Sequence, residues 1–423
     1  MKSILLYIAG FFSEAVFLIG FVALLGLLLQ KKKFNEVLSG TVKTMIGFLL
    51  ITNGAQSMGM TLLPIQPLIQ KIMGLSISTI DIGGSIGSSM SVFGASATLI
   101  FAFGFLTNVL IARVTRFRYI HLSAHVSFFY AGLISALLTV GTDLSALWIT
   151  VTGSLLLGIY LTFTCAYIAP LMKNIPGGEG FTIGHSSSIG CWISAQIGKI
   201  VGKNSKSIEE INLPESLSFL RETNIALSVI MTLIFFIASL FAGPSFVQEN
   251  ISGGKDIVIF SVLNGLMFGL WMTVIVTGVR MMLSEIVPAF HGISEKLVPN
   301  AVPGLDVPLL FPLHPTSVIV GFLSSLTAGI IGMLILGAIK YPVVVFPALI
   351  PTFFTGAVTA IFGNSTGGRR GAIIGSFVNG LILIFGQALL IPYIGGFEPV
   401  MRVLCETDYA FYGPLFGWII GVF

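Results

Sequence analysis

Three side chains that can exchange protons or hydrogen-bond a ligand stand in apolar or broken surroundings. His125 lies early in an apolar run, His185 follows a glycine-rich segment, and Asp306 stands between Gly304 and Pro308. An ionisable group inside a membrane segment is costly unless it faces a cavity or a partner, so each is a candidate functional residue. Imidazoles and carboxylates hydrogen-bond ligand hydroxyls and carry protons. The alternatives are structural: His125 could bond a neighbouring helix, and Asp306 could pair with Arg280.

Three stretches are too polar, or too rich in glycine and proline, to form ordinary membrane-crossing helices: 78–89, 176–188 and 299–315. Irregular backbone at membrane depth is stable only where protein buries it or where it lines a cavity. In transporters such re-entrant hairpins hold the substrate near the midplane. Asp81 in the first stretch and His314 in the third are further candidates. The alternative is that the second and third stretches are cytoplasmic loops.

The sequence has no pattern typical of an enzyme. It lacks a nucleophile elbow, a phosphate-binding loop with Lys-Ser/Thr, and any metal-ligand spacing of His, Cys and carboxylates. Cys165, Cys191 and Cys405 are far apart and give no disulfide framework or Cys-x-x-Cys site. We therefore expect no catalytic residues, no metal and no cofactor.

The composition indicates an all-α polytopic membrane protein. Of the 423 residues 55% are hydrophobic and only 9% are charged, too few to cover a water-facing surface. Mean hydropathy is +0.99. Soluble enzymes, nucleic-acid binders and disordered scaffolds are excluded on this basis, and long unbroken apolar runs argue against an outer-membrane barrel.

A membrane helix needs roughly 20 mostly apolar residues, and eleven segments approach that length. They are 4–30, 41–63, 93–112, 121–141, 145–168, 223–243, 257–280, 316–338, 343–362, 371–391 and 410–423. The last is short for a full crossing.

The distribution of basic residues predicts the topology. If Lys31, Lys32 and Lys33 are cytoplasmic and the sides alternate, sixteen of the 21 lysines and arginines fall on the inner side. The N-terminus is then outside and the C-terminus cytoplasmic. Five spans before a central hairpin and five of the six after it give the halves opposite orientation, the inverted-repeat plan of many transporters. We expect one permease domain over 1–423, with halves 1–222 and 223–423 and hairpins near 176–200 and 299–315.

Several strings resemble one known family. GFTIGH at 180–185 with Trp192, GVRM at 278–281, AFHGIS at 289–294 and LVPNAV at 297–302 with Asp306 resemble the ascorbate-type IIC permeases of the bacterial phosphotransferase system. GTVKTMIGF at 40–48 and the Leu213-Pro214 pair fit as well. The related galactitol-type permeases share Gly304-Leu305-Asp306 and a later histidine like His314. The resemblance runs through nearly the whole chain in order.

The resemblance implies a homodimer of eleven-helix protomers, each with a core domain that carries the sugar and a smaller dimerisation domain. It implies an elevator-like movement of the core in the cell membrane. The transported sugar is then phosphorylated by separate soluble IIA and IIB proteins, so this chain is a transport subunit rather than an enzyme. L-ascorbate is the first substrate expected, and a galactitol-like polyol is the alternative.

Carried over by position, the family's substrate contacts fall on Gly54, Ala55, His125, Phe129, His185, Ser186 and Asp306. The histidines and the aspartate match the family in type. Phe129 and Ser186 replace glutamines, and Ala55 replaces a serine. Because an unpaired ligand hydroxyl costs about 1–3 kcal/mol, these changes are expected to alter substrate discrimination.

Two other classes compete with this interpretation. An ion-coupled transporter would use Asp306 or His125 as its proton carrier. An integral membrane enzyme would need a second carboxylate beside Asp306, and no such residue is evident in the sequence.

Overall fold

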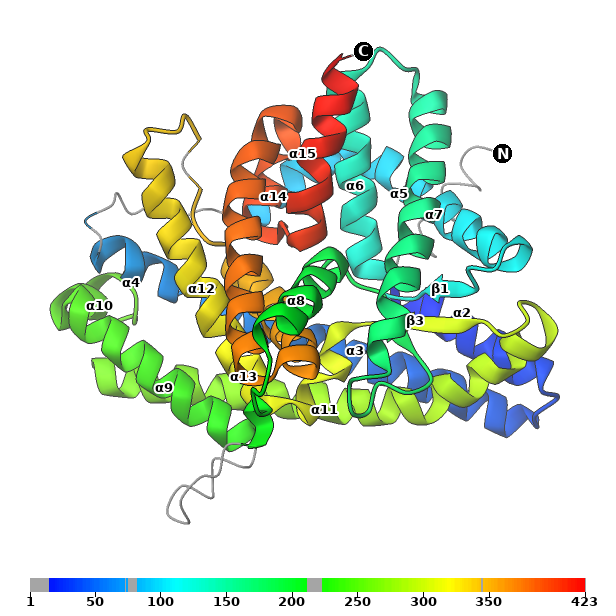
Figure 1. Cartoon of the computed structure of the whole chain (residues 1–423), viewed down its shortest axis with the longest axis horizontal. Helices are drawn as coiled ribbons and strands as arrows, with labels where there is room; N and C mark the ends of the chain where they lie inside the picture. Colours follow the sequence, from blue (N-terminus) through cyan, green and yellow to red (C-terminus); the bar gives the residue numbers. More distant parts are fainter. Residues whose placement is uncertain (1–14, 73, 75–81, 211–222, 344, 423) are drawn as a thin grey trace.

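The computed structural model describes residues 15–72, 74, 82–210, 223–343 and 345–422, and the chain there is almost entirely helical (Figure 1). The α-helices are α2 (Ala15–Leu29), α3 (Phe34–Leu62), α4 (Ile65–Ile72), α5 (Ile82–Val114), α6 (Ala124–Gly141), α7 (Ala146–Met172), α8 (Ser188–Val201), α9 (Thr223–Ala242), α10 (Pro244–Asn250), α11 (Ile257–Lys296), α12 (Pro315–Ala338), α13 (Leu349–Leu390), α14 (Glu398–Leu404) and α15 (Thr407–Val422). Short 3₁₀ turns include η1 (Ile208–Glu210), η3 (Val307–Leu309) and η4 (Phe311–Leu313). The prediction of an all-α polytopic membrane protein is confirmed.

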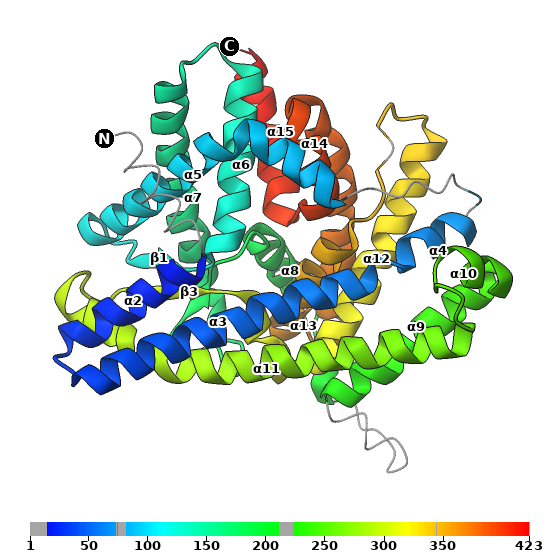
Figure 2. The ribbon, with the colours of Figure 1, turned by 180° about the vertical axis from the view of Figure 1, so that it is seen from behind.

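The helices form two groups. Helices α2, α3, α9 and α11 pack on one another and make up the flat group. The upright group contains α5, which packs with α6 and α7, and α13, which packs with α8, α12 and α15. Figure 2 shows α2, α3 and α11 side by side, with α6, α12 and α13 crossing them steeply. The correspondence of the two groups to a dimerisation domain and a core domain remains a prediction.

Glycine permits close contact between helices within the flat group. A Cβ atom added to Gly278 of α11 would lie 2.6 Å from the carbonyl oxygen of Gly47 in α3, so a side chain at this point would separate the two backbones. Small residues at helix crossings are typical of membrane proteins, because helix association there depends on close packing. Lys43 and Glu285 form an ion pair of 3.1 Å between the same two helices.

Every predicted span that lies within the described residues falls largely on a helix. Seven of the described helices are long and apolar enough to cross a membrane, or eight if the bent pair α9 and α10 is one span. That count is below eleven for the following reasons. Within the described residues α2 and α15 are shorter than a full crossing. The predicted spans 343–362 and 371–391 merge into the single element α13, and α9 qualifies only together with α10.

Helix α13 nevertheless turns back on itself. Gly368 has φ +55° and ψ −149°, a conformation that is essentially restricted to glycine. A Cβ added to Gly363 would overlap the carbonyl oxygen of Gly371. Eight residues of straight helix would separate these positions by about 12 Å. The two halves, 349–367 and 369–390, therefore pack against each other where two spans were predicted.

A small parallel sheet, absent from our expectations, joins the second and third irregular stretches. Its strands are β1 (Tyr119–His121), β2 (Thr182–Ile183) and β3 (Val302–Leu305), in the order β1-β3-β2. His121 pairs with Gly304, and Thr182 also pairs with Gly304 from the other side. The ladder satisfies backbone groups that glycine and proline leave outside helices. The first stretch is different, because from Ile82 onward it is the beginning of α5, whereas Asp81 lies outside the described residues.

A carboxylate from η1 caps the N-terminus of α12. The carboxylate of Glu209 in η1 accepts hydrogen bonds from the backbone N–H groups of Thr316 and Ser317, at 3.1 and 2.8 Å. The first N–H groups of a helix have no partner within it, and a carboxylate also complements the helix dipole. Glu209 therefore fixes the start of α12 beside the end of the third stretch.

Candidate substrate-binding site

The three strands place the three candidate ionisable residues. Asp306 directly follows β3, His185 lies two residues after β2, and His125 lies four residues after β1. Because the strands are parallel, their carboxyl ends share one edge of the sheet. The sheet therefore brings together residues that are up to 181 positions apart in the sequence (Asp306 minus His125).

Asp306 is at the centre of this cluster. Its Oδ2 lies 3.5 Å from Nε2 of His125, and its Oδ1 lies 3.6 Å from Nε2 of His185. Oδ1 also accepts a hydrogen bond of 2.7 Å from the N–H of Val307, which begins η3. The carboxylate is thus oriented by backbone, and Pro308 in the next turn fixes the local φ.

The two histidines differ in exposure. The side chain of His185 is 3% exposed, and its Nδ1 lies 3.1 Å from the hydroxyl of Ser187. The side chain of His125 is 39% exposed, and its ring packs near that of Phe48, with centroids 6.4 Å apart. Among the described residues Nδ1 of His125 has no hydrogen-bond partner. His125 therefore faces open space from one side of the cluster, and His185 forms its buried floor.

A second carboxylate, which the sequence analysis missed, completes the cluster. Oε2 of Glu406, in the link between α14 and α15, lies 3.4 Å from Nδ1 of His185. The hydroxyl of Ser186 donates a hydrogen bond to the same oxygen. Glu406 stands just before the last predicted span. A carboxylate in an apolar region was the signal that could have identified it.

The link that carries Glu406 is tied to the hairpin by main-chain and side-chain bonds. The N–H of Asp408 donates to the carbonyl of Ser186 at 2.8 Å. The carboxylate of Asp408 accepts from the N–H of Ile189 and from the hydroxyl of Tyr160, both at 2.8 Å. Asp408, at the start of α15, therefore connects the first turn of α8 to the middle of α7 beside the site.

These groups line a cavity of about 460 Å³, which we name the site cavity. Its walls come from α3, α6, α13, α14, α15, the hairpin, the segment after β3 and the α14–α15 link. The lining residues are Thr52, Gln56, Met60, His125, Val126, Phe129, His185, Asp306, Pro308, Ile350, Pro351, Phe354, Val403, Leu404, Glu406 and Tyr409. A mostly apolar hollow with a few convergent polar groups is typical of a small-molecule site.

Of the other predicted site residues, Phe129 lines the cavity and Ser186 is buried behind it, bonded to Glu406. Gly54 instead packs against α11, where an added Cβ would lie 2.9 Å from Cγ1 of Ile275. Ala55 is part of α3, and its side chain is outside the described set.

His314 also lies apart from the cavity. Its Nε2 is 3.1 Å from the carbonyl oxygen of Pro176, and the residue precedes the first turn of α12. It therefore joins the two irregular stretches instead of facing the site. Within the described residues no group of three or more His, Cys, Asp or Glu side chains is arranged to hold a metal ion.

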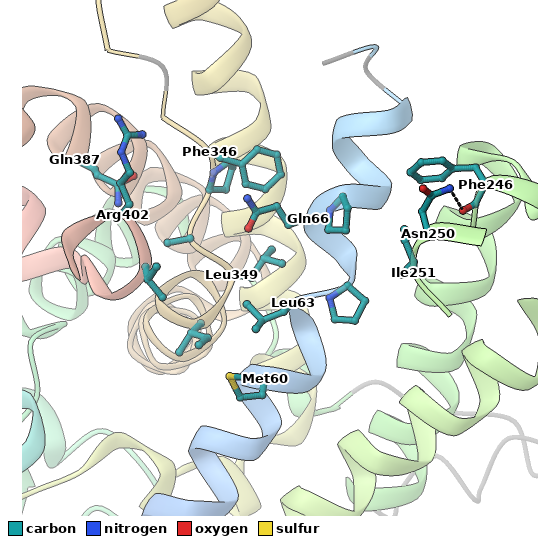
Figure 3. A pocket seen from close by; sticks show the side chains of 16 residues that line it. Met60, Leu63, Gln66, Phe246, Asn250, Ile251, Phe346, Leu349, Gln387 and Arg402 are labelled. Carbon is teal, nitrogen blue, oxygen red and sulfur yellow. Dashed lines mark hydrogen bonds between the residues drawn. The ribbon is translucent and has the colours of Figure 1, made fainter. Parts of the chain in front are cut away.

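A second cavity, of about 560 Å³, adjoins the first (Figure 3). The two share Met60, Ile350 and Val403 in their walls. Its own polar residues are Gln66 and Asn250 on one side and Gln387 and Arg402 on the other. We refer to it as the adjacent cavity.

Comparison with known proteins gives two findings. Residues 10–408 match the family model described as PTS system sugar-specific permease component. The chain is also 25% identical, over 425 residues, to an ascorbate-specific PTS system EIIC component of Mycoplasma pneumoniae. That match covers 87% of this chain and 63% of the relative, so the chain spans less than two thirds of the relative's length.

Proposed function

Because the chain belongs to the sugar-specific permease components of the phosphotransferase system, an integral membrane family, we propose that it binds a small carbohydrate in the site cavity and carries it across the bacterial cell membrane. The observation that carries this proposal is the convergence of His125, His185 and Asp306 on one hollow. Imidazole and carboxylate groups suit the hydroxyls of a sugar, and the apolar walls suit its carbon skeleton.

L-ascorbate is the first substrate we propose, since the relative from Mycoplasma pneumoniae is ascorbate-specific. A galactitol-like polyol is the second, because the cluster contains two carboxylates, which accept hydrogen bonds from hydroxyls and disfavour an anion. Both molecules are small enough for a cavity of about 460 Å³.

The walls of the site cavity support a movement of one helix group against the other. Thr52, Gln56 and Met60 belong to α3 of the flat group, and the ionisable cluster is attached to the upright group. We infer an elevator-like displacement of the upright group, with the flat group forming a homodimer in the lipid. On the predicted topology Arg402 lies on the outer side, so the adjacent cavity is the access route from outside.

Phosphorylation is assigned to separate IIA and IIB proteins on the cytoplasmic side, and this chain is the transport subunit. In this scheme transfer of phosphate to the sugar removes it from the transport equilibrium. An ion-coupled carrier, the main alternative, would depend on the proton gradient instead.

The test uses right-side-out membrane vesicles that contain the protein and are loaded with phosphoenolpyruvate and the soluble phosphocarriers. We expect labelled substrate to accumulate as its phosphate and to continue accumulating when the proton gradient is collapsed. Asp306→Ala is expected to lower uptake at least tenfold, about 1.4 kcal/mol of lost interaction.

Asp143→Ala is the matched control, because Asp143 is an exposed aspartate in the loop between α6 and α7. It should transport at the rate of the unmodified protein. Full-rate uptake by Asp306→Ala would remove that residue from the site. Uptake that stops when the proton gradient is collapsed, with the phosphate donor still present, would identify an ion-coupled carrier.

A further inference from the structure

The site cavity is acidic. Its described lining includes the carboxylates of Asp306 and Glu406 and the imidazoles of His125 and His185, but neither lysine nor arginine. Arg402, on the neighbouring helix α14, lines the adjacent cavity and is bonded to Glu398 at 2.6 Å. A guest in the site cavity therefore meets two acids and no permanent cation among these residues.

One imidazole lies between the two acids. His185 places Nε2 3.6 Å from Asp306 and Nδ1 3.4 Å from Glu406. A protonated His185 can compensate one carboxylate, so with both acids ionised and His125 neutral the cluster retains one negative charge. An anionic guest would bring a second, and like charges in a poorly hydrated cavity repel strongly.

The two acids are not equivalent. Asp306 receives the N–H of Val307 and has imidazole nitrogens near both of its oxygens. Glu406 receives the hydroxyl of Ser186, and it shares Nδ1 of His185 with the hydroxyl of Ser187. Donors to a carboxylate favour its ionised form, so Glu406 is the acid that more readily holds a proton.

The other titratable groups around Glu406 do not reverse this ranking. Asp408 and Asp306 are like charges that act on it, and Cys405 and Tyr409 interact with it as neutral groups at ordinary pH. His125 acts through Asp306. His185 is the basic group in contact with Glu406, and Asp306 competes for it.

We propose that Glu406 is a specificity-determining residue that selects the guest by charge, so that an anionic guest binds with a proton held on Glu406 whereas an uncharged guest needs none. This inference rests on the proposed function only in taking the site cavity as the place where the guest binds. L-ascorbate is an acid and a monoanion at neutral pH. According to this proposal its anion and one proton are taken up together. The proton enters the Glu406 carboxyl on binding and returns to water on release.

Equilibrium binding of two ligands to the purified protein tests the proposal, from mildly acidic to mildly basic pH. For L-ascorbate the affinity should fall by up to tenfold per pH unit on the basic side, as expected when one proton is bound with the ligand. Glu406→Gln, which mimics the protonated acid, should abolish that slope and bind L-ascorbate more tightly than the unmodified protein at basic pH. Galactitol, which is uncharged, should show no slope in either protein.

Glu179→Gln is the matched control, because Glu179 is an exposed glutamate in the hairpin that precedes β2. It should keep the slope for L-ascorbate. A slope that persists in Glu406→Gln, or no slope for L-ascorbate in the unmodified protein, would overturn the proposal, and a purely structural role of Glu406 would weaken both ligands at every pH.

A measurement without ligand separates this proposal from the proposed function. Infrared difference spectra across the same pH range should show the C=O band of protonated carboxyls that disappears on going to basic pH. One component of this band should be missing in Glu406→Gln and retained in Glu179→Gln. If neither ligand binds, carbohydrate binding in this cavity fails, and the infrared titration still decides the role of Glu406. A Glu406 carboxyl that is ionised at every pH would refute the proposal that Glu406 holds the proton.

Discussion

The bond between Asp408 and Tyr160 gives the sharpest test of how the site is held. Asp408 is completely buried, and its two oxygens accept bonds of 2.8 Å from Ile189 N–H and from Tyr160 O–H, respectively. In Asp408→Asn one oxygen can still accept from Ile189, but the amide NH₂ group cannot accept from the hydroxyl. The Tyr160 hydroxyl then loses its partner in a buried place. We expect the free energy of unfolding to fall by about 1–3 kcal/mol.

Tyr160→Phe removes the other member of the pair and should cost about 0.5–1.5 kcal/mol, because it deletes the donor along with the bond. The ring of Tyr160 stacks on that of Tyr130 at 3.8 Å, and phenylalanine preserves this contact. The double variant isolates the bond itself. We expect the two changes together to cost less than their sum by about 1–2 kcal/mol, since the bond can be lost only once.

The assay is reversible unfolding of the purified protein in detergent micelles by a denaturant, with tryptophan fluorescence as the signal for all four proteins of the cycle. Substrate binding is measured on the same samples, because displacement of the hairpin from the α14–α15 link would also disturb Ser186 and Glu406. Additivity within about 0.5 kcal/mol would refute the reasoning, because independent sites behave in that way.

Two further predictions concern the backbone around the site. Gly368→Ala should destabilise the protein by about 1–3 kcal/mol, because its φ of +55° disfavours a side chain and the new Cβ would overlap the carbonyl oxygen of Lys206. The control is Gly337→Ala, in open space on α12, which should be neutral or slightly stabilising. Both are measured by thermal unfolding. Equal effects of these two changes would contradict the turn in α13. Glu209→Ala should cost about 0.5–2 kcal/mol through loss of the α12 cap, and Glu210→Ala, at an exposed position, should cost under about 0.5 kcal/mol in the same assay. No difference between the two glutamates would show that the cap does not stabilise α12.

The sequence predicts the helical segments well because apolar length is a strong signal. The split of α13 also follows from a local feature, since the polar segment 363–370, which contains Gly367 and Gly368, separates two apolar stretches. The number of complete crossings is less predictable. Helices α2 and α15 have the right composition but are 15 and 16 residues long.

The candidate site was only partly predictable. His125, His185 and Asp306 stood out because ionisable groups are rare in such surroundings, and the structure places them around one cavity. The sheet that positions them was not expected, because strands of two to four residues leave no periodic pattern in the sequence. Glu406 was overlooked for a different reason: its partner, Ser186, lies 220 positions earlier in the chain.

The three-stranded sheet separates the placement of the site from its chemistry. The strands are held by main-chain bonds, such as that from the N–H of Leu122 to the carbonyl of Gly304 at 2.8 Å, and these bonds do not depend on which side chains follow. Residues just beyond the strand ends can therefore be exchanged over evolutionary time while their Cα atoms keep the same arrangement. A permease built in this way can acquire a new substrate by altering a few side chains, without any change to the sheet that positions them.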